Sequence, residues 1–91
     1  MKLRYSDRAA RQIDAALDYI AERSPRGAAV VQQRILAMEA LLKDHPYAGY
    51  ATSRLGVRRF ALTPHPYLVD YLVTGAAIVV MRFRHSSRRP M

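Results

Sequence analysis

The chain contains no cysteine, so disulfide bonds and thiolate metal sites are excluded and the compartment is left undecided. No stretch reaches the ~18 consecutive apolar residues that a membrane-spanning helix needs. The first residues, MKLRYSDRAA, also lack the apolar core of a signal peptide. We therefore expect a cytoplasmic protein with no membrane partner.

Acidic residues are scarce in the second half of the chain. Residues 1–45 carry eight basic and six acidic residues, whereas residues 46–91 carry seven arginines and a single acid, Asp70. The net charge is +8, and thirteen of the fifteen cations are arginine, which suits bidentate contacts with phosphate or carboxylate. The basic half is either a solvated surface or a face for a polyanion or an acidic protein. Its clustering near one end of the chain favours the second interpretation.

Recognisable catalytic motifs are also missing. The chain has no nucleophile motif, no glycine-rich phosphate loop and no zinc-ligand spacing. An i,i+4 row of acids has the spacing of a weak metal site, but no histidine lies near it and solvated surface explains it: Asp14, Asp18 and Glu22. We expect neither a metal nor another cofactor.

The length of 91 residues allows one domain, residues 1–91, and the hydrophobic fraction of 51% argues against disorder. Residues 1–5 alternate as in a short half-buried strand. A helix over residues 7–23 is predicted from a Ser6-Asp7 cap and apolar residues at helical spacing. Ser24-Pro25 starts a second helix, which ends near residues 44–46 and forms a helical hairpin with the first.

The second half of the chain predicts strands. Residues 47–56 are expected to be a loop, a strand follows from Val57, and residues 63–66 form a proline turn. Residues 67–73 and 76–84 are apolar strands joined by a tight Thr74-Gly75 turn. The expected class is α+β: an N-terminal strand, an αα-hairpin and a three-stranded antiparallel meander, with the helices on one face of the sheet.

The end of the last strand carries the candidate functional residues. Alternation places Arg82 and Arg84 on one face and His85 on the other. His85 could act as a general acid or base, with Arg59 and Arg88 stabilising a phosphodiester. The alternative is that His85 only ends the strand and hydrogen-bonds to the main chain.

Aromatic residues offer a second kind of contact, because exposed rings can stack on bases. Tyr67 and Tyr71 share one face of a central strand, where core packing explains them. Tyr47 and Tyr50 lie in the expected loop and are the better candidates for contact with a partner.

The order of these elements, together with VRRF, the PYLVDY strand and an H-x-x-R end from His85 to Arg88, resembles the RelE/ParE toxin superfamily. It looks most like the ParE, or plasmid-stabilisation, branch, and the resemblance covers nearly the whole chain. It implies a bacterial toxin whose cognate antitoxin, acidic and ParD-like, neutralises it by direct binding. In the ParE branch the implied target is DNA gyrase, and in the RelE branch it is ribosome-bound mRNA, which is cut.

The resemblance also implies where the partners would bind. The antitoxin would cover the helical hairpin and the sheet edge, where the apolar residues are Ile13, Leu17, Ile20, Val31, Ile35 and Met38. The target, or nucleic acid directly, would meet the basic residues and the histidine, namely Arg58, Arg59, Arg82, Arg84, His85, Arg88 and Arg89.

Several positions depart from the nuclease branch of the superfamily. Leu68 stands where an arginine is usual, residues 47–56 contain no acid, and Ser86 replaces a tyrosine that one subgroup has after the histidine. These departures favour a toxin that binds gyrase without chemistry of its own. Two alternatives stay open: an mRNA endonuclease that uses Arg59, His85 and Arg88, and a non-toxic binding module of the same fold.

Overall fold

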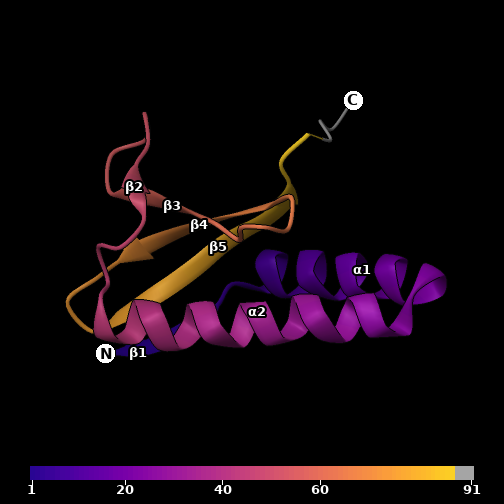
Figure 1. Ribbon diagram of the computed structural model, residues 1–91. Coiled ribbons are helices and arrows are strands. Elements are labelled where there is room, and N and C mark those ends of the chain that lie inside the picture. The colour runs from indigo at the N-terminus through magenta and orange to yellow at the C-terminus, as the bar shows by residue number, and fades with distance from the viewer. Residues whose placement is uncertain (88–91) are drawn as a thin grey trace.

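A helical hairpin covers one face of a five-stranded sheet in the computed structural model, which describes residues 1–87 (Figure 1). The predicted α+β class is confirmed. The order of the elements is β1 (Lys2–Tyr5), α1 (Asp7–Arg23), α2 (Pro25–Asp44), β2 (Tyr50–Ala51), β3 (Val57–Ala61), β4 (Tyr67–Val73) and β5 (Ala77–His85). None of the helices in residues 1–87 combines the length and the hydrophobicity needed to cross a membrane.

Two serine caps fix where the helices begin, as the sequence predicts. The Ser6 hydroxyl accepts a hydrogen bond from the main-chain N–H of Ala9 at 3.0 Å. The Ser24 hydroxyl accepts one from Gly27 at 2.9 Å, and Pro25 follows it at the first helical position. Each cap satisfies a main-chain donor that has no partner within its helix. Ser24 also ends α1, so the two helices join without an intervening loop.

The strands lie in the order β1-β5-β4-β3-β2. β3, β4 and β5 form the predicted antiparallel meander, and β1 pairs parallel to β5. One segment was predicted as loop but pairs with the sheet: Tyr50 and Ala51 form β2 beside Arg59 and Arg58 of β3. Two residues are too few to show an alternating pattern, so the sequence gives no signal for this strand.

The hydrophobic core lies between the helical hairpin and the sheet. Packing of the amphipathic helices on the alternating faces of the strands removes these side chains from water. The buried members are Ala9, Val31, Ile35, Met38 and Leu42 of the helices, Val69 and Tyr71 of β4, and Ile78, Val80 and Phe83 of β5, together with Leu62 and Tyr67. In residues 1–87, the opposite face of the sheet, here called the open face, has no helix over it (Figure 1).

Candidate functional site

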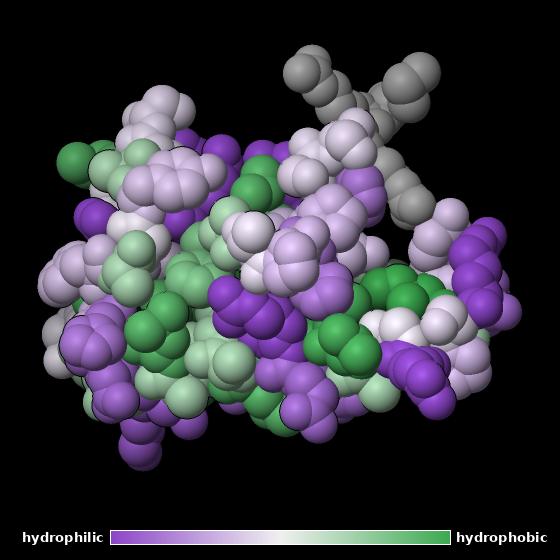
Figure 2. Space-filling model, viewed as in Figure 1, coloured by the Kyte–Doolittle hydropathy of each residue, from purple (hydrophilic) through white to green (hydrophobic). Residues whose placement is uncertain are grey.

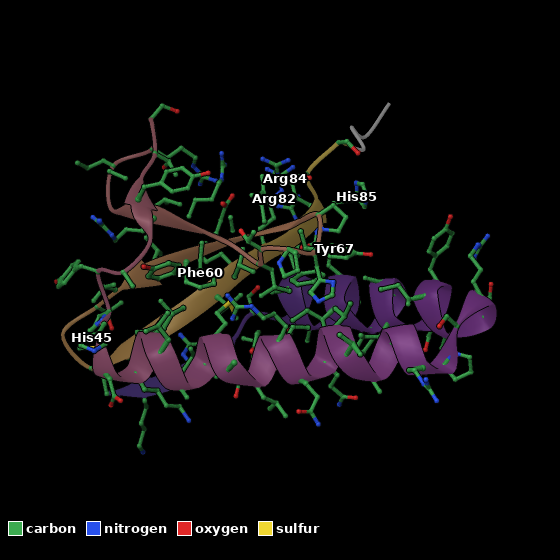
Figure 3. All side chains as sticks on the ribbon, in the orientation of Figure 1. His45, Phe60, Tyr67, Arg82, Arg84 and His85 are labelled. Carbon is green, nitrogen blue, oxygen red and sulfur yellow. The ribbon has the colours of Figure 1, made fainter. Side chains whose placement is uncertain are left out.

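A β-bulge in β5 decides where the basic side chains point. Val80 and Arg82 lie opposite consecutive residues of β4, which leaves Met81 between them without a direct partner there. In a regular strand Arg82 would share the helix-facing side of Val80. The extra residue shifts the alternation, so Phe83 is buried against the helices and Arg82 and Arg84 project from the open face. Figure 3 shows both arginines on the side of the sheet away from the helices.

The start of α1 satisfies the main chain around this bulge. The N–H of Ser6 donates to the carbonyl of Val80 at 2.8 Å, and its hydroxyl donates to the carbonyl of Met81 at 3.2 Å. Further along, the side-chain oxygen of Gln12 accepts a hydrogen bond from the N–H of Phe83 at 2.8 Å. The bulge is therefore held in place by the helix that follows β1, and the direction of the arginines is fixed with it.

Four side chains form a row across the open face. Tyr50, Arg59, Asp70 and Arg82 lie directly opposite one another on β2, β3, β4 and β5. Side chains paired in this way share one face of a sheet. Arg84 lies on the same face two residues further along β5. We call these five residues the open-face row.

Asp70 neutralises one of the arginines in this row. Its carboxylate accepts hydrogen bonds from Nε of Arg59 at 2.6 Å and from a terminal nitrogen of the same guanidinium at 3.3 Å. Asp70 is only 5% exposed, and a buried carboxylate needs such a partner. The hydrogen bond that Arg59 donates to Asp70 raises the pKa of Arg59, against the opposing effect of burial. Arg59 is thus committed to a neighbour within the chain.

Arg82 and Arg84 are not committed in this way. The Nε atom of each guanidinium is covered by the protein, and neither has a hydrogen-bond acceptor within residues 1–87. Buried donors in folded proteins are nearly always paired, so two unpaired donors on one face require an explanation. The open-face row therefore carries two cations whose Nε donors have no hydrogen-bond partner in the described part of the chain.

Arg58, which was expected to bind the target, is held by the segment before β2. Its Nε donates to the carbonyl of Gly49 at 3.0 Å, and a terminal nitrogen donates to the carbonyls of Gly49 at 2.6 Å and Tyr47 at 3.3 Å. Its guanidinium also lies 5.4 Å from the centre of the Tyr47 ring. These contacts give Arg58 a structural role in the described chain.

His85 lies on the helix-facing side of the sheet, so the structure does not bring it together with Arg59. Its ring meets the edge of the Tyr67 ring at 5.4 Å between centres. Its Nδ1 accepts a hydrogen bond from the N–H of Ser87 at 3.2 Å, with the Ser87 hydroxyl at 3.0 Å. A hollow of about 520 Å³ between α1 and the end of β5 opens beside it, lined in part by Arg8 and Tyr19. Arg88 and Arg89, also expected at the site, lie outside the described residues.

The helical residues expected to bind an antitoxin fall into two groups. Val31, Ile35 and Met38 are buried in the core, whereas Ile13, Leu17 and Ile20 are half-buried and pack at its margin. A groove of about 250 Å³ runs between the helices, and its lining includes Ile13, Leu17, Ile35 and the exposed Leu36. Figure 2 shows separate hydrophobic areas on the face that includes α2, divided by hydrophilic side chains.

Two features of the candidate sites escaped the sequence analysis. Asp70 was noted only as the single acidic residue of residues 46–91. Its position inside the apolar strand YLVDYLV could have indicated a buried ion pair. Two carboxylates, Asp14 and Glu39, line the groove between the helices, and the Tyr5 hydroxyl donates to Glu39. In residues 1–87, no group of His, Asp or Glu side chains is arranged to hold a metal ion.

The fold and the open-face row define a small basic α+β domain in which one face of the sheet is cationic and has no helix over it within residues 1–87. A family model described as the ParE toxin of the type II toxin–antitoxin system parDE matches residues 3–90, and the chain belongs to this family. The ParE resemblance seen in the sequence is thereby confirmed. One similar solved structure is described as a chromosomal ParDE TA system from P. aeruginosa. It is 26% identical, with a TM-score of 0.82, and the match covers 93% of this chain and 95% of that chain. No curated protein matches the chain.

Proposed function

We propose that this chain is a toxin that inhibits DNA gyrase by binding, without chemistry of its own, and that a cognate acidic antitoxin neutralises it. Membership of the ParE family supports the toxin role. The observation that carries the mode of action is the separation of the candidate catalytic groups. Arg59 is paired with Asp70 on the open face, and His85 lies on the other side of the sheet.

This separation favours binding over RNA cleavage. A general acid or base must lie within hydrogen-bond reach of the atom it serves, next to the groups that stabilise the developing charge. A phosphodiester held by Arg59 would have the sheet between itself and His85. The guanidinium groups of Arg82 and Arg84, whose Nε donors have no acceptor within residues 1–87, suit the recognition of an anionic target instead.

The antitoxin is proposed to lie over the groove between α1 and α2. The ParDE solved structure is described as a toxin–antitoxin system, which supports a partner of this kind. Ile13, Leu17 and Leu36 are accessible there, whereas Val31, Ile35 and Met38 would support the groove from beneath. The net charge of +8 would speed the encounter with an acidic protein in the cytoplasm.

The test is a supercoiling and DNA-cleavage assay with purified gyrase and this chain, freed from its antitoxin. The expected result is loss of supercoiling with trapped cleaved DNA, and recovery when the antitoxin is added. Arg84→Gln should weaken the inhibition more than Arg26→Gln, which removes the same charge from the exposed start of α2.

Folded protein without any effect on gyrase would refute the proposal. The next measurement would then be mRNA cleavage on ribosomes by the chain and by His85→Ala. Cleavage that His85→Ala abolishes, with antitoxin binding intact, would establish the endonuclease alternative.

A further inference from the structure

We propose that the open-face row is a site for single-stranded nucleic acid, in which Arg82 and Arg84 bind phosphates, Tyr50 stacks on a base and Asp70 limits the affinity. The inference deepens the proposed function and rests on it for its setting, since Arg82 and Arg84 are proposed there to recognise an anionic target. The binding itself can be measured without gyrase.

The two arginines provide the first argument. Each has an Nε donor that is covered and lacks an acceptor within residues 1–87. A phosphate on the open face would accept hydrogen bonds from the outer nitrogens and let the guanidinium groups turn outward. The unpaired Nε donors would then gain access to an acceptor. Binding would thereby remove the cost of two hydrogen bonds that are not made in the free chain.

The spacing of the row provides the second argument. Arg82 and Arg84 are alternate residues of one strand, so their Cα atoms are about 7 Å apart. Tyr50 lies in the same row, three strand spacings from Arg82. With strands ~4.8 Å apart, the Cα atoms of Tyr50 and Arg82 are separated by about 14 Å. Its side chain is 53% exposed, unlike the buried Tyr71. Phosphate-binding cations at one end and an exposed aromatic ring at the other are typical of sites for single strands.

The sheet itself favours nucleic acid over an acidic peptide as the ligand. Along the row, β3 and β4 have a neighbouring strand on both sides, whereas β5 beyond Val80 pairs with β4 alone, and the side chain of Gln12 binds the N–H of Phe83 at its other edge. The main-chain groups of β3 and β4 are therefore engaged, and a ligand that lies across the open face meets side chains there. An extended peptide could pair with the main chain only at the edge of β5, away from Tyr50, whereas a phosphate chain needs only the side-chain donors and the stacking surface of the row.

Asp70 sets the strength of this site. It lies between Arg59 and Arg82 in the row and holds Arg59 through two hydrogen bonds. Its charge cancels that of Arg59, so the row presents the two charges of Arg82 and Arg84. Replacing the carboxylate with an amide would remove the negative charge beside Arg59, so the row would present a third positive charge to a phosphate.

The experiment is fluorescence anisotropy of a short labelled oligothymidylate with the purified chain over a range of salt concentrations. We expect Arg82→Gln and Arg84→Gln each to reduce the slope of log K against log[salt] by about 0.7 in magnitude. Tyr50→Ala should lower the affinity at least about fivefold. Asp70→Asn should increase the slope by a similar ~0.7, provided that urea unfolding shows it to be folded. Arg26→Gln is the matched loss of one charge on the helical side and should change the slope little.

Two results would overturn the inference. If Arg26→Gln weakens binding as much as Arg82→Gln and Arg84→Gln, the attraction is diffuse and there is no site. If polyglutamate displaces the oligonucleotide at equal charge concentration, the face recognises acidic protein instead. Gyrase inhibition by a chain that does not bind the oligonucleotide would refute this inference and leave the proposed function intact. Oligonucleotide binding without any effect on gyrase would support this inference and refute the proposed function.

Discussion

The substitution Tyr71→Phe tests how the segment before β2 is held against the sheet. The Tyr71 side chain is fully buried, and its hydroxyl donates to the carbonyl of Pro46 at 2.8 Å. The same hydroxyl accepts a hydrogen bond from the N–H of Gly49 at 2.9 Å. One oxygen atom from the central strand therefore ties down both ends of a four-residue stretch that leads into Tyr50.

The expected loss of stability follows from these two bonds. Phenylalanine keeps the ring, so no cavity forms in the core and the effect comes from the hydroxyl alone. A hydrogen bond contributes about 1 kcal/mol, and a buried group left without a partner costs ~1–3 kcal/mol. Gly49 is buried, so its N–H has no direct access to water. We expect Tyr71→Phe to lower the free energy of unfolding by about 2–4 kcal/mol.

Urea unfolding followed by circular dichroism measures this difference, and the melting temperature should fall by at least ~8 °C for a domain of this size. Amide hydrogen exchange at Gly49 should accelerate more than exchange in α1. Tyr47→Phe removes a hydroxyl from a side chain that is 66% exposed and should change the stability little. A loss below ~0.5 kcal/mol for Tyr71→Phe would refute the reasoning, because water or main-chain movement would then replace both bonds.

Three further substitutions test other contacts. Gly49→Ala should destabilise the chain by about 1–3 kcal/mol in urea unfolding, because its Cβ would lie 2.6 Å from a main-chain oxygen of β3; wild-type stability would contradict this. Ser6→Ala should cost about 1–2 kcal/mol and more than Ser24→Ala, since only Ser6 also bonds to the bulge of β5; equal losses would contradict this. Burial, and then the contact with Glu39, raise the pKa of Tyr5. Above about pH 10 the Tyr5 hydroxyl loses its proton in the unfolded chain but keeps it in the folded chain. The contribution of Tyr5 to the free energy of unfolding is therefore fully present below about pH 10 and falls above it. Tyr5→Phe should make unfolding curves less sensitive to alkaline pH, and an unchanged pH dependence would contradict the assignment.

Local sequence signals predicted most of the fold because the deciding interactions are local. Ser6 and Ser24 cap the two helices through donors three residues away, and the Thr74-Gly75 turn joins neighbouring strands. β2 escaped prediction because its two residues are ordered by pairing with β3 and by the hydroxyl of Tyr71, a contact that spans 22 residues in sequence. A pattern read along the chain contains no trace of such a contact.

The candidate site was predicted less well than the fold, because a count of charges does not show which charges are already paired. The sequence grouped Arg58, Arg59, Arg82 and Arg84 as one basic set. In the structure Arg58 binds main-chain carbonyls and Arg59 binds Asp70, so two of the four serve the fold. The partners of both arginines depend on how the strands and the segment before β2 lie against one another, which cannot be read from the sequence.

The bulge at Met81 is the step that joins the fold to the site. Ile78 and Val80 belong to the core, and strict alternation would send Arg82 and Arg84 into the core as well. Two unpaired buried cations would cost more than the chain could offset, so the hydrophobic pattern and the charges conflict unless one residue is inserted. The change of phase in AIVVMRFRH is therefore itself a signal of the bulge, readable once the core face is known. The same insertion that keeps the arginines out of the core places them side by side on the open face, where residues 1–87 offer their Nε donors no acceptor.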